Sequence, residues 1–91
     1  MDESKRGVTI VSGVNEAFRF RKENKGCSSE EIMGHIVSYV ENVKSDIRKK
    51  EIIAGVNYAL KISEKEPKLS DAKIMDRIVN NLDKIVLTKK D

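Results

Sequence analysis

The chain has 91 residues, of which 36% are charged and 38% are hydrophobic, and its net charge is +3. This length excludes two independently folded domains, and the composition suits a folded chain better than a disordered one. A single cysteine excludes an internal disulfide framework, and no apolar run approaches the ~18 residues of a membrane helix. We therefore expect one domain over residues 1–91, in the cytoplasm and with no membrane partner.

The first predicted helix covers residues about 8–24. Its apolar residues recur at helical spacing between Thr9 and Phe20. Gly26 follows, and glycine readily takes the left-handed conformation that closes a helix at its carboxyl end. The sequence therefore predicts a short turn before the second helix.

The second predicted helix covers residues about 29–45. Ser28 is a good N-cap, and Glu31 three residues later completes a capping box. Cys27 and Ile32 are placed to form a hydrophobic staple around this cap. A stripe of apolar residues then follows the helical period: Ile32, Met33, Ile36, Val37, Val40, Val43 and Ile47.

A turn near Lys44–Lys50 separates this helix from the third, predicted at residues about 49–65. The apolar residues beyond this point would fall on the opposite face of a continuous helix, and one straight helix cannot bury both faces in one core. The third helix should end before Pro67, because the residue that precedes proline avoids helical angles. Ser70 is the expected N-cap of a fourth helix at residues about 71–87.

The chain repeats itself at an offset of 42 residues, which aligns Val8–Val43 with Lys50–Ile85 without a gap. Ten of these 36 positions are identical, where unrelated sequences would share about two or three. The identical pairs are Ile10/Ile52, Gly13/Gly55, Val14/Val56, Asn15/Asn57, Ala17/Ala59, Ser28/Ser70, Ile32/Ile74, Met33/Met75, Ile36/Ile78 and Val37/Val79. We interpret them as two tandem copies of a helical hairpin, one at about 7–48 and one at about 49–90.

The predicted fold class is therefore all-α. Short connections imply antiparallel neighbours, and the duplication implies a pseudo-twofold axis that relates the two hairpins. A solenoid of helical pairs shares this period but needs about three or more repeats to bury its faces. Two repeats can instead close on each other, which favours a compact four-helix domain.

The sequence has few residues in the patterns that bind a metal or a cofactor. Placing Gly26 at the glycine position of an EF-hand loop would put Arg21 and Lys25 at ligand positions, which excludes calcium. His35 and Cys27 are too few for a zinc site within one chain. We expect His35 to be a solvated surface residue and Cys27 a small buried one. No catalytic residue, metal or cofactor is therefore expected, and the chain is not expected to be an enzyme.

Gly13/Gly55 and Asn15/Asn57 are repeated residues inside predicted helices. Glycine there costs up to about 1 kcal/mol relative to alanine, so a compensating reason should exist in both copies. A structural interpretation is close helix crossing at the glycines, with each Asn side chain hydrogen-bonded to fix the helix register. A functional interpretation is a symmetric pair of recognition groups, and the structural interpretation is favoured.

Two sets of basic residues are candidate nucleic-acid contacts. Lys73, Arg77, Asn80 and Lys84 recur along one row of the fourth helix, and the corresponding row of the second helix is not basic. The second set is Lys44, Arg48, Lys49 and Lys50, at the expected turn. An ordinary solvated surface is the alternative, because Asp76 and Asp83 lie close enough to the first row to neutralise it.

Three apolar or aromatic residues point away from the centres of their predicted stripes: Phe20, Tyr58 and Ile62. Such residues often mark interfaces, although a four-helix core can also cover wide stripes. The leading functional hypothesis is a non-catalytic module for protein interaction or self-association that uses these three residues. The alternative is a small basic nucleic-acid-binding protein that uses the fourth helix and the Lys44–Lys50 turn.

Overall fold

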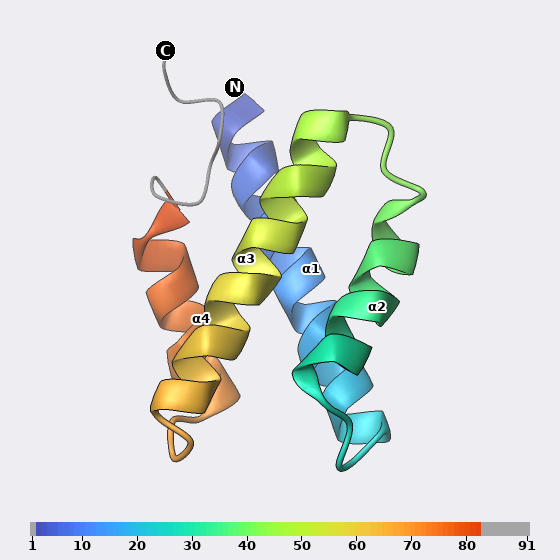
Figure 1. Cartoon of the computed structure of the whole chain (residues 1–91). Helices are drawn as coiled ribbons and strands as arrows, with labels where there is room; N and C mark the ends of the chain where they lie inside the picture. The colour runs from blue at the N-terminus through green and yellow to red at the C-terminus, as the bar shows by residue number, and fades with distance from the viewer. Residues whose placement is uncertain (1, 83–91) are drawn as a thin grey trace.

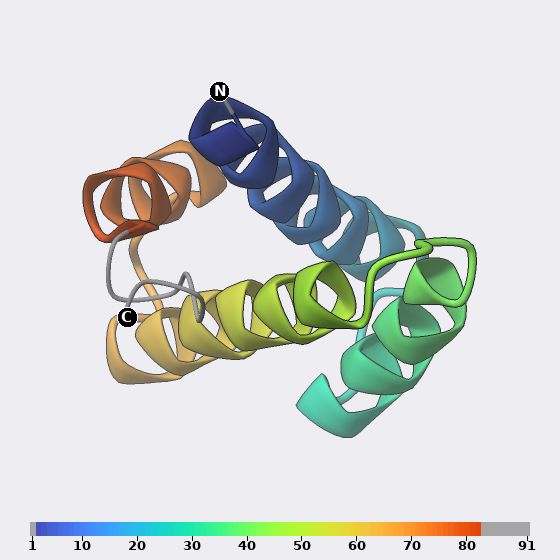
Figure 2. The same cartoon turned by 90° about the horizontal axis from the view of Figure 1, so that it is seen from above.

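Four helices make up the part of the chain that the computed structural model describes, residues 2–82, with side chains described from residue 7 onward. They are α1 (Asp2–Glu23), α2 (Ser29–Val40), α3 (Asp46–Lys65) and α4 (Asp71–Asn80), and residues 2–82 contain no strand. α1 and α3 cross at the centre of the molecule, with α2 on one side of the crossing and α4 on the other (Figures 1 and 2). The Cα radius of gyration is 12.6 Å, as expected for a compact chain of this length.

Small residues set three of the helix boundaries: Gly26, Ser28 and Ser70. Gly26 takes the left-handed conformation, with φ of 86°, in the turn after α1. Ser28 caps α2, and its hydroxyl accepts from the backbone N–H of Glu31 while the Glu31 carboxylate accepts from the backbone N–H of Ser28. Ser70 caps α4 in the same position. These features confirm the predicted caps and the predicted starts of α2 and α4.

The connection between α2 and α3 lies earlier than the sequence pattern predicted. α2 ends at Val40 and α3 begins at Asp46, so of the turn expected at Lys44–Lys50 only Lys44 and Ser45 lie in the connection, and the rest of that prediction is wrong. Ser45 caps α3 by accepting a hydrogen bond from the backbone N–H of Arg48. The Ser–Asp pair at the start of α3 is a strong helix-start signal, which outweighs the change of apolar face that suggested a later turn.

The core is built from residues that correspond at the 42-residue offset. Six buried pairs share that offset: Ile10/Ile52, Val14/Val56, Ala17/Ala59, Phe18/Leu60, Ile32/Ile74 and Ile36/Ile78. The apolar stripe predicted for α2 is narrower than expected, because Val37 is 48% exposed. Ile47 belongs to α3 instead of α2 and is 45% exposed. Glu51, which the apolar pattern did not mark, is buried at 1% exposure.

The two central helices approach each other at their glycines. A Cβ atom added to Gly55 would lie 2.6 Å from Cγ2 of Ile10, and one added to Gly13 would clash in the same way with Cγ2 of Ile52. Both contacts are to the branched Cγ2 methyl of isoleucine, which cannot swing away as the end of a long side chain can. The glycines are therefore explained by close helix crossing.

We expect Gly13→Ala and Gly55→Ala each to lower the free energy of unfolding by about 1–3 kcal/mol, because the added methyl overpacks the crossing. Gly34→Ala in α2 is the matched control, since nothing lies within 4 Å of its added Cβ. That variant should gain up to about 1 kcal/mol from helix propensity. Urea denaturation of the three variants measures the difference, and equal effects at Gly13 and Gly34 would contradict the close crossing.

Candidate functional site

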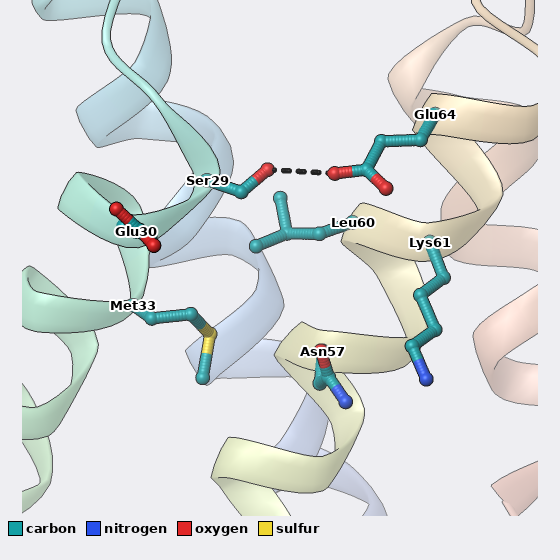
Figure 3. Close-up of a pocket in the computed structure, with 7 residues that line it drawn as sticks. All are labelled: Ser29, Glu30, Met33, Asn57, Leu60, Lys61 and Glu64. Carbon is teal, nitrogen blue, oxygen red and sulfur yellow. Dashed lines mark hydrogen bonds between the residues drawn. The ribbon is translucent and has the colours of Figure 1, made fainter.

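A groove lies between α2 and α3. Its volume is about 360 Å³, and its lining residues are Ser29, Glu30 and Met33 of α2 and Asn57, Leu60, Lys61 and Glu64 of α3 (Figure 3). Counted from Asn57, the other three residues of α3 follow after three, four and seven positions, which places all four on one face of the helix. Both walls of the groove are thus regular helices, which hold the lining side chains in fixed register.

The groove combines an apolar floor with a polar rim. Met33 and Leu60 form the apolar part, and Leu60 is 5% exposed. The Ser29 hydroxyl donates a 3.0 Å hydrogen bond to Oε2 of Glu64, which joins the two helices at one end of the groove (Figure 3). Glu30 is exposed and forms no ion pair with any described residue. An apolar floor with carboxylates at the rim is suited to hold a side chain of another molecule.

The repeated asparagines are both exposed, and neither side chain bonds to another residue in the part of the chain described. The predicted register-locking hydrogen bonds of Asn15 and Asn57 are therefore wrong. Asn57 lines the groove, where its amide faces solvent and is free to bond a ligand. Its helical position gave no sign of this role, because the groove depends on which residues α2 brings opposite it.

None of the three predicted partner contacts lines the groove. Ile62 is 8% exposed and belongs to the core, which agrees with the alternative that a four-helix core covers wide apolar stripes. Tyr58 is half-buried against the core. Phe20 is also half-buried, and its ring stacks on that of His35 with centroids 4.3 Å apart and planes inclined by 15°. All three residues lie in or next to the core. This explains why apolar side chains occur at these positions although they fall away from the centres of the predicted stripes.

His35 lies in a contact between α1 and α2, which corrects its predicted place on the solvated surface. Its Nε2 is 2.6 Å from Oε2 of Glu16, and the side chains of Glu16 and His35 are 15% and 30% exposed. Arg19 donates to both Glu16 oxygens and also pairs with Glu23. These hydrogen bonds, first that of Arg19 and then that of His35, hold the pKa of the Glu16 carboxyl below its ordinary value.

The basic row predicted on α4 is only partly available. Arg77 is bound through both of its terminal nitrogens to the two carboxylate oxygens of Glu66. The hydrogen bond from Arg77 lowers the pKa of Glu66 below its ordinary value. Lys73 and Asn80 are exposed, and Lys84 lies outside the described residues. The partner that neutralises Arg77 comes from the α3–α4 connection, and the nearby Asp76 forms no ion pair with a described residue.

The other predicted basic set lies at the start of α3. Lys44 precedes the helix and is exposed, Lys50 is exposed, and Arg48 and Lys49 are half-buried. This segment lies at the same end of the molecule as the start of α1 (Figure 1). It is separated from α4 in both views, so the two predicted basic sets do not form one surface (Figures 1 and 2).

Within residues 2–82, no group of three or more His, Cys, Asp or Glu residues is placed to hold a metal ion. The Glu16–His35 pair is an acid–base pair by its chemistry, but it does not line the groove and is covered by the Phe20 ring. Among the described helices, none has a segment both long enough and apolar enough to span a bilayer.

The chain matches no protein-family model, no curated protein and no solved structure in the comparisons with known proteins.

We expect Glu16→Gln to lower the free energy of unfolding by on the order of 1 kcal/mol at neutral pH, because the charged hydrogen bonds to Arg19 and His35 are lost. A lowered pKa in the folded state stabilises the protein above the ordinary value of 4.5, and this contribution is lost as the pH falls through the lowered folded value. The difference between wild type and variant should therefore disappear in acid.

Glu23→Gln is the control for this prediction, because Glu23 is exposed and pairs with the same Arg19. We expect a change below about 0.5 kcal/mol for Glu23→Gln. Thermal unfolding across the acid range measures both variants. A loss for Glu16→Gln that persists unchanged at low pH would contradict the assignment.

Proposed function

We propose that this chain is a non-catalytic protein-interaction module that binds a segment of a partner protein in the groove between α2 and α3. The observation that carries the proposal is the open groove with an apolar floor at Met33 and Leu60 and the free amide of Asn57 beside it. A buried apolar anchor with a few polar groups that fix its orientation is the usual pattern of a binding hot spot.

The charge of the groove rim defines the chemistry of the proposed partner. Glu30 and Glu64 are carboxylates without an ion-pair partner among the described residues, although Glu64 accepts the hydrogen bond from Ser29. Lys61 is the one cation that lines the groove. A segment with one large aliphatic side chain next to a Lys or Arg satisfies both the floor and the acidic rim.

The two halves of the chain are proposed to be copies of one helical hairpin related by a pseudo-twofold axis. The reciprocal contacts of Gly13 with Ile52 and of Gly55 with Ile10 support this, because each contact is the other with its partners exchanged. A hydrogen bond from Arg21 to Ser63 adds support, since these residues correspond at the 42-residue offset. Residues near a twofold axis are the ones expected to meet their own counterparts.

The duplication supplies an internal control for the groove. The position that corresponds to Asn57 is Asn15, which is exposed on α1. The residue that corresponds to Glu64 there is Lys22, so the charge at that end is reversed. A partner selected by the acidic rim of the groove should therefore not bind at the equivalent position on α1.

Selection from a library of random peptides tests the proposal. The enriched peptides should share an aliphatic residue next to Lys or Arg, and fluorescence anisotropy measures their affinities. Asn57→Trp should weaken binding by at least about tenfold, because the indole fills the groove. Asn15→Trp, which places the same bulk on the other repeat, should leave binding almost unchanged.

The outcomes separate the alternatives. Enriched peptides that bind both variants equally would rule out the groove as the site. Sedimentation equilibrium tests self-association separately. If the wild type forms dimers and Asn57→Trp is monomeric, the occupant of the groove is a second copy of this chain and not another protein.

A further inference from the structure

The start of α3 carries four cations within a short segment, and no described carboxylate forms an ion pair with them. Lys44, Arg48, Lys49 and Lys50 lie within one loop and the first turns of the helix, and none forms an ion pair with any described residue. Glu41 and Asp46 are exposed acids nearby in sequence, and neither is paired with these cations. We call these four cations the α3 basic cluster.

Arg48 of this cluster differs from the other arginines whose side chains are described. Among the arginines with described side chains, Arg19, Arg21 and Arg77 each form an ion pair with a carboxylate. Arg48 is the exception within this part of the chain, although it is half-buried. A half-buried guanidinium has lost part of its hydration, so a charged partner stabilises it more than it stabilises a fully exposed lysine.

The helix itself adds to the positive potential. The amino end of a helix carries a partial positive charge, and cations in the first turn are unfavourable there by a few tenths of a kcal/mol or more. Asp46 opposes this effect at the first position of α3. Arg48 lies in this first turn, where the helix dipole disfavours a cation and favours an anionic ligand beside it.

We propose that the α3 basic cluster binds the phosphate backbone of nucleic acid. A guanidinium and several ammonium groups within a short segment can each contact a phosphate, and such contacts do not depend on base sequence. α4 is not part of this site, because its Arg77 is already held by Glu66 and α4 lies apart from the start of α3 (Figure 2).

An anionic membrane is a less suitable ligand for this cluster. Membrane-surface helices insert a continuous apolar face into the lipid. The apolar face of α3 is in the core, through Ile52, Val56 and Ala59. Within residues 44–50, Ile47 is the one large apolar side chain, and it is 45% exposed. The α3 basic cluster can attract anions, but α3 has no free apolar face to insert into lipid. The phosphates of a polynucleotide are therefore a more suitable ligand than a membrane surface.

Fluorescence anisotropy of labelled duplex DNA and of single-stranded RNA, titrated with the full chain over a range of salt concentrations, tests the site. Wild type should bind at near-physiological salt with a log–log slope of about −3 to −4 on DNA, as expected for about four phosphate contacts. The variant Lys44→Gln, Arg48→Gln, Lys49→Gln, Lys50→Gln should bind at least about tenfold more weakly and lose most of the slope.

A variant with the same change in net charge separates the cluster from general electrostatic attraction. Lys22→Gln, Lys25→Gln, Lys65→Gln, Lys68→Gln removes four exposed lysines at the opposite end of the molecule. It should bind within about threefold of wild type. Circular dichroism establishes that both variants keep their helices before the affinities are compared.

Three results would overturn the proposal: no binding at near-physiological salt, an equal loss in the two variants, or binding to vesicles of phosphatidylserine but not to DNA or RNA. The third result would assign the cluster to a membrane surface. The cluster and the groove are separate sites, so none of these results bears on the proposed protein partner.

Discussion

Close approach of α1 and α3 is the constraint on which the rest of the packing depends. Gly13 and Gly55 remove the side chains that would hold the two helix axes apart, and Ile10 and Ile52 fill the space that the glycines leave. The unfavourable helix propensity of two glycines is offset by two fully buried isoleucines at the contact. With the central pair set at this separation, α2 and α4 can each pack against both central helices from opposite sides.

The polar side-chain contacts that join α1 to the other helices are concentrated in one part of the molecule. Glu16, His35 and Arg19 join α1 to α2, and Arg21 joins α1 to α3 and α4 through Ser63 and Asp71. The second half of α1, which carries Glu16, Arg19 and Arg21, lies at the end of the molecule away from the start of α3 (Figure 1). Within the part of the chain that the structure describes, the α3 basic cluster makes no comparable contact.

The groove and the α3 basic cluster differ in how much each depends on the packing of the helices. The groove requires two helices, because Met33 comes from α2 and Leu60 and Asn57 come from α3. Its shape therefore depends on the tertiary packing, and loosening the α1–α3 crossing would change it. The α3 basic cluster is local to one loop and the helix that follows it, so its charge density would persist even if the packing shifted.

The all-helical class, the four helices and the caps at Ser28 and Ser70 could be predicted from the sequence, because caps and apolar period are local properties of the chain. The sequence also marked Gly13 and Gly55 as contacts of close helices. The change of apolar face along the sequence predicted the α2–α3 turn too late in the chain. The N-cap at Ser45 is the stronger signal for the start of α3.

The exposure of Asn57, the burial of Ile62 and Glu51, and the pairing of His35 with Glu16 depend on how the helices pack and could not be predicted from the sequence. Each of these depends on which residues a second helix brings opposite the first, and helical period within one segment carries no information about that partner.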